Sequence, residues 1–179
     1  MAVLKKGNLS INLGIFKVGG DFSDDDRQCA WELYTEIVTR LAVHGRTNLD
    51  VPLEEQFEGE LLTESFSSLY AFFREMRGIM RKFPVGKIEC IDEYHLGKFT
   101  CAIMNDILRP FLEKWQGDFR HWFDVESRKR QSDSPFLIQK DYPQLKELLK
   151  GWSDLRSLMQ SVSQTLAREY QLVHSVNCE

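Results

Sequence analysis

The sequence lacks the short motifs that mark most familiar enzyme classes. It contains no GxSxG, HExxH, GxxxxGK[ST] or GxGxxG motif, so no serine-hydrolase elbow, zinc-protease helix or glycine-rich phosphate loop is predicted. Its carboxylates do not form the paired Glu-x-x-His sets of di-iron helical bundles. We therefore expect no cofactor and favour a non-catalytic protein, although a site can also assemble in space without a motif.

Cysteines are few and widely spaced, and long apolar runs are missing. The four cysteines, Cys29, Cys90, Cys101 and Cys178, form no CxxC pair. No window approaches the roughly 18 uninterrupted apolar residues of a membrane span. The first residues do not resemble a signal peptide. These absences predict a cytoplasmic protein with reduced thiols and no membrane segment.

A metal site would have to come from one stretch of the chain. Cys90, His95 and Cys101 could supply three zinc ligands, with Asp92 or Glu93 as a fourth. Structural zinc sites normally use closely spaced cysteine pairs, which this stretch lacks. A buried cysteine also packs as a small apolar residue. We therefore predict no bound metal.

Positive charge is not in excess. The chain has 23 Lys and Arg against 27 Asp and Glu, a formal net charge of −4. Broad nucleic-acid binding needs a surplus of positive charge to displace counterions, so nucleic acid is not the expected partner. A local basic stripe remains, because Arg74, Arg77 and Arg81 have a spacing that places them on one side of a helix. This stripe is a candidate binding surface for an acidic partner or a phosphate.

Two apolar patterns with helical spacing dominate what is present. The first comprises Leu62, Phe66, Leu69, Phe73, Met76, Met80 and Phe83, and the second Leu145, Leu148, Trp152, Leu155, Met159, Val162, Leu166 and Leu172. A helix of 3.6 residues per turn brings such positions to one side, which has to be buried. The sequence therefore predicts a mainly all-α fold. We expect an antiparallel bundle of four to five helices in a single domain over residues 1–179.

Local signals predict where these elements begin and end. A capping box at Ser23–Asp26 opens a first helix that reaches about residue 43, with Leu41 on its buried side. The following helices are expected over about 59–83, from about 97 onwards, and from 141–143 to about 173. Residues 1–22 are predicted to form an extended arm or β-hairpin. Residues 124–140 are predicted to be a flexible loop, because the run ESRKRQSDS has no apolar side chain.

Pro110 falls inside an apolar helical pattern, so a kink or break is predicted there. A break leaves backbone carbonyls without helical partners, and the nearby Arg109 or Asn105 can donate to them. Irregular backbone between packed helices is also a common place for a ligand. Asn105 and Arg109 are therefore candidates for either a structural or a binding role.

Arg40 and His44 resemble the Arg and His of the HEPN ribonucleases, which polarise a phosphate and move a proton. That family has four to six residues between the two, whereas only three intervene here, and a second polar residue after the Arg is missing. A cationic pair at a helix C-terminus, which complements the helix dipole, is the structural alternative. A HEPN-like ribonuclease or nucleotide-binding protein, using Arg40/His44 or the arginine stripe, is thus the second functional hypothesis.

Three segments carry a further resemblance. They are Ala30–Tyr34 with Thr39 and Arg40, Ser68–Tyr70 with Phe73 and Arg74, and Asn105 with Leu108–Leu112 and Trp115. Together, over residues 30–115, they resemble a group of uncharacterised bacterial all-helical proteins, some of them carried in conflict or antiphage gene neighbourhoods. The resemblance implies a bacterial accessory protein, with antiviral defence as one setting, and it implies no site residue.

The leading hypothesis is a non-catalytic helical protein that acts by binding a protein partner. Twelve Phe and four Trp are many for one core. Aromatic side chains left on the surface would mark the contact site. A homo-oligomer is the other assembly that such surfaces would allow.

Overall fold

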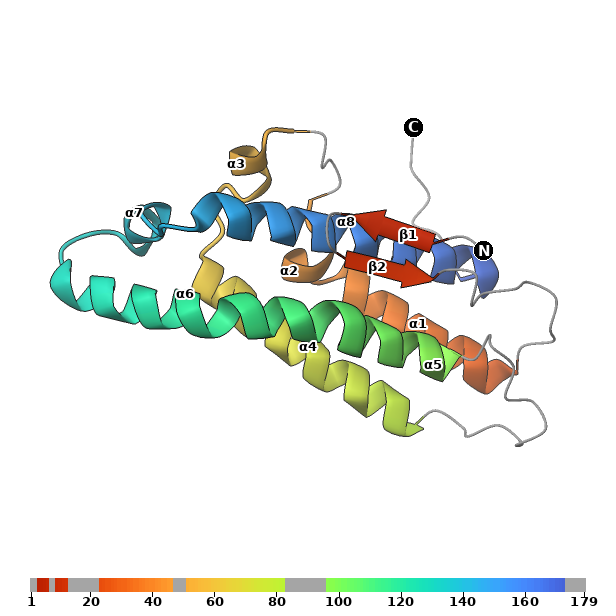
Figure 1. Ribbon diagram of the computed structural model, residues 1–179. Helices are drawn as coiled ribbons and strands as arrows, with labels where there is room; N and C mark the ends of the chain where they lie inside the picture. Colours follow the sequence, from red (N-terminus) through yellow and green to blue (C-terminus); the bar gives the residue numbers. More distant parts are fainter. Residues whose placement is uncertain (1–2, 7–8, 13–22, 47–50, 83–95, 173–179) are drawn as a thin grey trace.

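The computed structural model describes residues 3–6, 9–12, 23–46, 51–82 and 96–172 (Figure 1). The fold is all-α in class, as the apolar periodicity predicts. The helices are α1 Asp24–Val38, α2 Leu41–His44, α3 Leu53–Gln56, α4 Leu62–Lys82, α5 Leu96–Ala102, α6 Arg109–Lys129, α7 Pro135–Lys140 and α8 Leu145–Glu169. A π-helical segment, Ile103–Leu108, joins α5 to α6. The short strands β1, Val3–Lys6, and β2, Leu9–Asn12, pair antiparallel.

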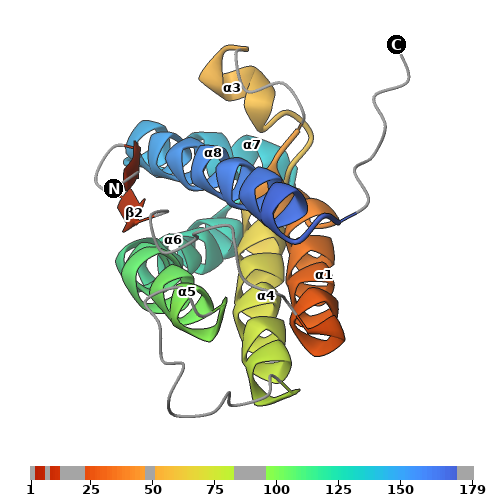
Figure 2. The ribbon, with the colours of Figure 1, turned by 90° about the vertical axis from the view of Figure 1, so that its right-hand side faces the viewer.

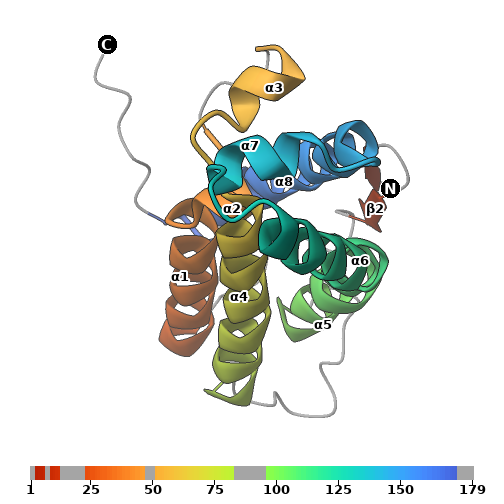
Figure 3. The ribbon, with the colours of Figure 1, turned by 90° about the vertical axis from the view of Figure 1, so that its left-hand side faces the viewer.

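The long helices pack around α4. Two opposite views place α4 between α1 on one side and α5 with α6 on the other, while α8 crosses over the ends of α1 and α4 (Figure 2 and Figure 3). Helix α3 stands on the far side of α8 from α1 and α4, and α7 lies near the start of α8. Helices α3 and α7, which come from distant parts of the sequence, therefore lie at the same end of the molecule.

Aromatic side chains form the centre of the core. The Phe66 ring on α4 lies 4.6 Å from Trp152 on α8, 5.7 Å from Phe119 and 6.2 Å from Phe111, the last two on α6. The Trp152 indole N–H donates to the carbonyl of Ala42, 2.7 Å away, so the buried ring has no unpaired polar atom. One cluster of rings thus joins three helices.

The two apolar patterns predicted for residues 62–83 and 145–172 are confirmed in large part. On α4 the buried members are Leu62, Phe66, Leu69, Phe73 and Met76, and on α8 they are Leu148, Trp152, Leu155, Met159, Val162 and Leu166. Phe72 and Ile79 are buried as well, so the apolar side of α4 is wider than the predicted seam. Met80 is half-buried, and Phe83 lies outside the described residues.

The prediction of one helix from 23 to about 43 is wrong. The capping box at Ser23 is present, but α1 ends at Val38, Arg40 is extended, and α2 is a separate turn. Leu41, predicted to be buried, is 46% exposed. The break is held by α8, where Trp152 donates to the Ala42 carbonyl and the Gln160 amide donates to the carbonyl of His44. These partners lie more than a hundred residues away in the sequence, beyond the reach of a local pattern.

The prediction of a flexible loop over 124–140 is wrong for most of this segment, in which 130–134 are the residues outside a helix. Helix α6 continues to Lys129, and α7 occupies Pro135–Lys140. The polar run is held by charge pairs, since Lys129 contacts Glu126 at 2.7 Å and Arg130 bonds to Asp133 at 2.7 Å. The Lys129–Glu126 pair lies within the last turn of α6 and supports it, whereas the Arg130–Asp133 pair lies in the turn between α6 and α7.

Pro110 does not break the helix at which it stands. The Arg109 N–H bonds to the carbonyl of Met104, five residues earlier, and the wide π turn runs directly into α6. A proline has no N–H and crowds the carbonyl four residues before it. The extra residue of a π turn moves that carbonyl out of α-helical register. The chain therefore continues from α5 through the π segment into α6 without a break.

Candidate functional site

The predicted arginine stripe is present on the outer side of α4. Arg74, Arg77 and Arg81 are exposed, and Tyr70, at the same helical spacing, is 54% exposed beside them. Arg74 pairs with the neighbouring Glu75 at 3.1 Å. The Arg77 guanidinium lies 4.8 Å from the centroid of the Phe73 ring. Two of the three cations are thus already engaged by their own helix, although such exposed pairs are weak.

The other two predicted binding residues lie on different elements from the stripe. Asn105 is exposed on the π segment, and Arg109 is exposed at the start of α6. Within the described residues, the Arg109 side chain has no hydrogen bond or ion pair with a backbone carbonyl or any other group. The predicted carbonyl-capping role of Arg109 is therefore not seen in this part of the chain.

Arg40 directly precedes α2, and His44 is its last residue. The Arg40 guanidinium is 2.6 Å from the Glu36 carboxylate, four residues earlier. His44 is half-buried, and burial lowers the pKa of its imidazole, which favours the neutral ring. A ribonuclease would need the Arg40 guanidinium for the phosphate, and here Glu36 already holds it.

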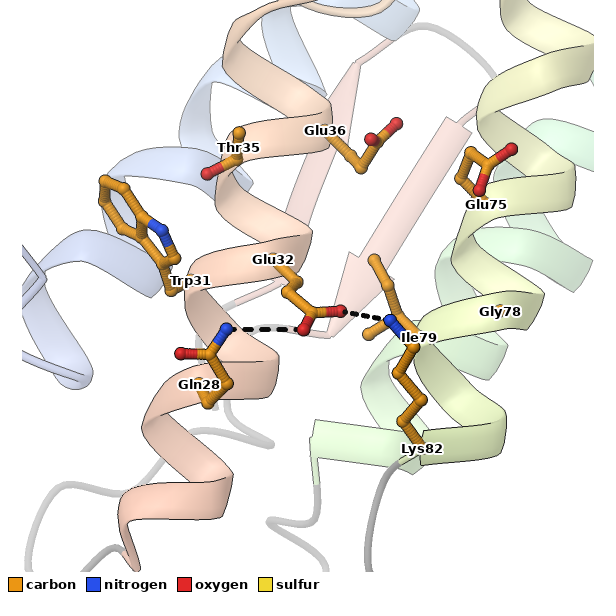
Figure 4. Close-up of a pocket in the computed structure, with 9 residues that line it drawn as sticks. All are labelled: Gln28, Trp31, Glu32, Thr35, Glu36, Glu75, Gly78, Ile79 and Lys82. Atoms are coloured by element: carbon orange, nitrogen blue, oxygen red, sulfur yellow. Dashed lines mark hydrogen bonds and ion pairs between the residues drawn. The ribbon is translucent and has the colours of Figure 1, made fainter.

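A polar pocket of about 380 Å³ lies between α1 and α4 (Figure 4). Glu32 lies at its centre and accepts from Gln28 at 3.3 Å and from Lys82 at 3.5 Å. The other two carboxylates also have arginine partners, since Glu36 pairs with Arg40 just after α1 and Glu75 pairs with Arg74 on α4. Each carboxylate of this pocket thus has a partner within the chain, which leaves little charge to attract a ligand.

A larger groove of about 820 Å³ lies between α3, α7 and the start of α8. We call it the α3–α7 groove. Its apolar members are Phe57, Leu62, Phe136, Leu145 and Leu149, and its charged or polar members are Glu54, Glu55, Glu58, Gln139 and Lys140, with Gly59 between them. Apolar lining with few polar groups is typical of binding clefts in proteins.

Two large apolar side chains of α7 are exposed at this groove or beside it. Phe136, which lines the groove, is 43% exposed, and the next residue, Leu137, is 54% exposed. The groove was not predicted from the sequence, because residues 124–140 were expected to form a loop. A signal was present, since Ser134 followed by Pro135 has the composition of a helix N-cap and first turn, directly before Phe136.

The opposite rim of the groove is acidic. Glu54 and Glu55 on α3 and Glu58 just after it are exposed. Within the described part of the chain, none of the three carboxylates makes an ion pair. Lys140 is the single basic residue that lines the groove. In contrast to the pocket between α1 and α4, this rim has unpaired negative charge facing an apolar surface.

A buried ion pair lies beneath the α3 side of the groove. Arg156 on α8 is fully buried, and its guanidinium lies 2.6 Å from the carboxylate of Glu60, which is also buried. The same guanidinium is 4.3 Å from the centroid of the Phe57 ring and donates to the Gln56 carbonyl at 3.4 Å. Burial lowers the pKa of Arg156, while the Glu60 carboxylate raises it. The pair fixes the segment after α3 to α8.

Gln139 holds the α7 side of the groove in the same way. Its amide N–H donates to the Glu60 carbonyl at 2.8 Å, and its amide oxygen accepts from the Leu62 backbone N–H at 2.9 Å. Gln139 and Arg156 therefore meet at Glu60, one from α7 and one from α8. We call Glu60, Gln139 and Arg156 the buried clamp. It sets both walls of the α3–α7 groove relative to each other.

Comparison with protein-family models, curated proteins and solved structures finds no match to this chain. The resemblance over residues 30–115 therefore stays a prediction. Among the described residues, no three His, Cys, Asp or Glu side chains are placed to hold a metal ion. Cys90 and His95 lie outside the described residues, and Cys101 is exposed. Helices with the length and apolar character needed to cross a bilayer are not found in the described ranges.

Proposed function

We propose that the chain is a non-catalytic helical module that binds a protein partner through the α3–α7 groove. The observation that carries this proposal is the apolar groove with exposed Phe136 at its wall. Large apolar side chains that remain in water at a groove are typical of interaction sites. Aromatic anchors also contribute most of the binding energy in many interfaces.

The buried clamp supports the proposal, because it makes the groove a preformed feature. Glu60 is bound to both Gln139 and Arg156, so α7 and the segment after α3 cannot move apart without breaking buried hydrogen bonds. Breaking such bonds leaves buried polar groups unpaired. A site that is already in its binding geometry loses less conformational entropy when the partner arrives.

The rest of the molecule serves as the scaffold in this proposal. We take the long helices as an antiparallel bundle of four to five helices with an N-terminal hairpin. The cellular setting that we propose is the bacterial cytoplasm, with an accessory role in a defence system. This part rests on the resemblance over residues 30–115 and on the absence of a membrane segment or cysteine motif from the sequence.

Panning a phage-displayed peptide library against the full chain tests the groove. We expect enriched peptides whose binding is lost in Phe136→Ala. The matched control is Tyr70→Ala, which removes an equally exposed ring from α4, away from the groove. Both variants should melt like the wild type, since neither side chain is buried. The proposal fails if no peptide is enriched, or if the enriched peptides bind Phe136→Ala as well as the wild type.

The alternative function is a HEPN-like ribonuclease or a nucleotide-binding protein. The observation in its favour is the outer side of α4, where Arg74, Arg77 and Arg81 lie beside Tyr70. The Glu36 contact of Arg40 weighs against the ribonuclease form. Incubation of RNA and nucleotides with the wild type and His44→Ala separates the two forms. RNA cleavage that disappears in His44→Ala would replace the binding proposal with a catalytic one.

A further inference from the structure

We infer that the occupant of the α3–α7 groove is a basic amphipathic helix of a partner protein. Its apolar side chains would lie against Phe57, Phe136 and Leu149, and its Lys or Arg side chains would face the acidic rim. This inference rests on the proposed function, which makes the groove a binding site. It adds the chemistry and secondary structure of the partner.

The negative charge of the rim favours a partner segment with positive charge. Glu54, Glu55 and Glu58 place three exposed carboxylates along one side of the groove, against the single ammonium of Lys140. Within the described residues these carboxylates make no ion pair, and the Arg46 guanidinium beside Glu58 donates to its backbone carbonyl, so a binding segment can supply cationic partners. Each exposed contact is weak, but several of the same sign steer encounter and reject a partner of like charge.

The groove walls select a helix over an extended strand. A strand partner binds by adding to an exposed sheet edge. The α3–α7 groove offers no such edge, because its walls come from α3, α7 and the start of α8, together with the turn that follows α3. A helix needs only an apolar surface for side chains at i, i+3, i+4 and i+7. The helix-in-groove mode fits these walls, and it is the mode that we infer.

The polar group on the apolar floor argues against a small polar ligand. A small molecule is usually oriented by a few free donors and acceptors inside its pocket. Gln139 lines the groove, but its amide N–H and its amide oxygen both bond within the buried clamp. The remaining floor, formed by Phe57, Leu62 and Leu149, is apolar. The groove therefore recognises apolar shape in its depth and charge at its rim.

Three labelled peptides of about four helical turns test this inference by fluorescence anisotropy against the full chain. The first carries Leu on one side and Lys on the other, the second replaces Lys with Glu, and the third is a scrambled Leu/Lys sequence without an apolar side. We expect the first peptide to bind. Binding should weaken about tenfold or more in Glu54→Lys/Glu58→Lys, since two attractive contacts become repulsive. It should be unchanged in Asp106→Lys/Glu113→Lys, which makes the same charge change at exposed positions on the π segment and α6.

The outcomes separate this inference from the proposed function. Equal binding of the scrambled peptide, or equal weakening in Asp106→Lys/Glu113→Lys, would show unspecific charge attraction and overturn the inference. If the Leu/Glu peptide binds as tightly as the Leu/Lys peptide and Phe136→Ala abolishes both, the groove is a binding site but the charge assignment is wrong. If no amphipathic peptide binds while the library yields extended peptides that depend on Phe136, the helical assignment is wrong. The proposed function itself fails only when nothing depends on Phe136.

Discussion

Glu60 is the residue whose charge matters most for stability. It is buried against the fully buried Arg156 at 2.6 Å, so Glu60→Gln leaves a buried guanidinium without its counter-charge. We expect the free energy of unfolding to fall by about 3–5 kcal/mol in urea denaturation. Glu75→Gln, which removes the carboxylate from the exposed pair with Arg74, should change it by less than about 0.5 kcal/mol. Equal effects of the two substitutions would show that the Arg156–Glu60 pair is not the anchor that its burial indicates.

Gly45 and Gly59 differ in how tightly their surroundings and backbone exclude a side chain. Both glycines have a φ of 75°, and Gly45 also has a ψ of −171°, a combination that is essentially confined to glycine. A Cβ at Gly45 would lie 2.7 Å from Cδ of Arg156, whereas a Cβ at Gly59 meets nothing within 4 Å. We therefore expect Gly45→Ala to lower the free energy of unfolding by about 1–3 kcal/mol more than Gly59→Ala. Identical losses in thermal or urea unfolding would mean that neither the contact with Arg156 nor the backbone conformation of Gly45 resists a side chain there.

His44 gives the fold a pH dependence of known sign. Burial lowers its pKa below the ordinary 6.5, so below pH 6.5 the unfolded chain binds the proton more readily than the folded chain. The His44 contribution to the free energy of unfolding is therefore intact above pH 6.5. It falls as the pH drops from 6.5 toward the folded pKa. In His44→Gln this part of the acid destabilisation should be missing. NMR titration of the His44 ring would contradict the prediction if its pKa were 6.5 or higher.

At the scale of elements, the junction of α5 and α6 depends on backbone geometry rather than on the Arg109 side chain. Arg109 is exposed, and within the described residues its guanidinium bonds to no carbonyl freed by Pro110. The π segment instead takes up the extra residue before the proline. We expect Arg109→Ala to change the free energy of unfolding by less than about 0.5 kcal/mol in urea denaturation. A loss of about 1–3 kcal/mol would restore the carbonyl-capping role that the sequence suggests.

Helices were predictable where one periodic apolar pattern determines burial, as in α4 and α8. Phe66 and Trp152, central in these patterns, are also central in the core. Boundaries set by distant partners were not predictable. Gln160 binds the carbonyls of His44 and Arg46, which fixes the separate α2 turn from the other end of the chain. The polar run 126–134 was predicted to be a loop throughout, but residues 126–129 continue α6 and residues 130–134 form a turn.

At the scale of the whole molecule, one candidate site was predictable from the sequence and the other was not. The stripe of Arg74, Arg77 and Arg81 was predictable because one helix carries it. The α3–α7 groove combines residues 54–62 with residues 136–149, and tertiary contacts such as those of Gln139 and Arg156 with Glu60 bring these two segments together. No spacing rule connects Glu58 with Phe136. Surfaces made by one helix can therefore be read from sequence, whereas a groove between distant segments needs the fold.

The buried clamp makes a prediction about the molecule as a whole, because Gln139 joins α7 to the segment that begins α4. Gln139→Leu fills similar space but leaves the Leu62 N–H and the Glu60 carbonyl without their partner, which should cost about 1–3 kcal/mol of unfolding free energy. Amide exchange should accelerate across α7, and the Leu/Lys peptide should bind more weakly, since one wall of the groove is no longer fixed.

The matched control is Gln164→Leu, which makes the same change at an exposed position on α8 and should alter none of these quantities. Stability lost without faster exchange in α7 would show that Gln139 supports the core but not the groove. If amide exchange in α7 and peptide binding change together, the hydrogen bonds of the buried clamp hold the binding surface in place. The groove would then depend on the same buried contacts that hold α3, α7 and α8 in one fold, and partner binding should in turn slow amide exchange in α7.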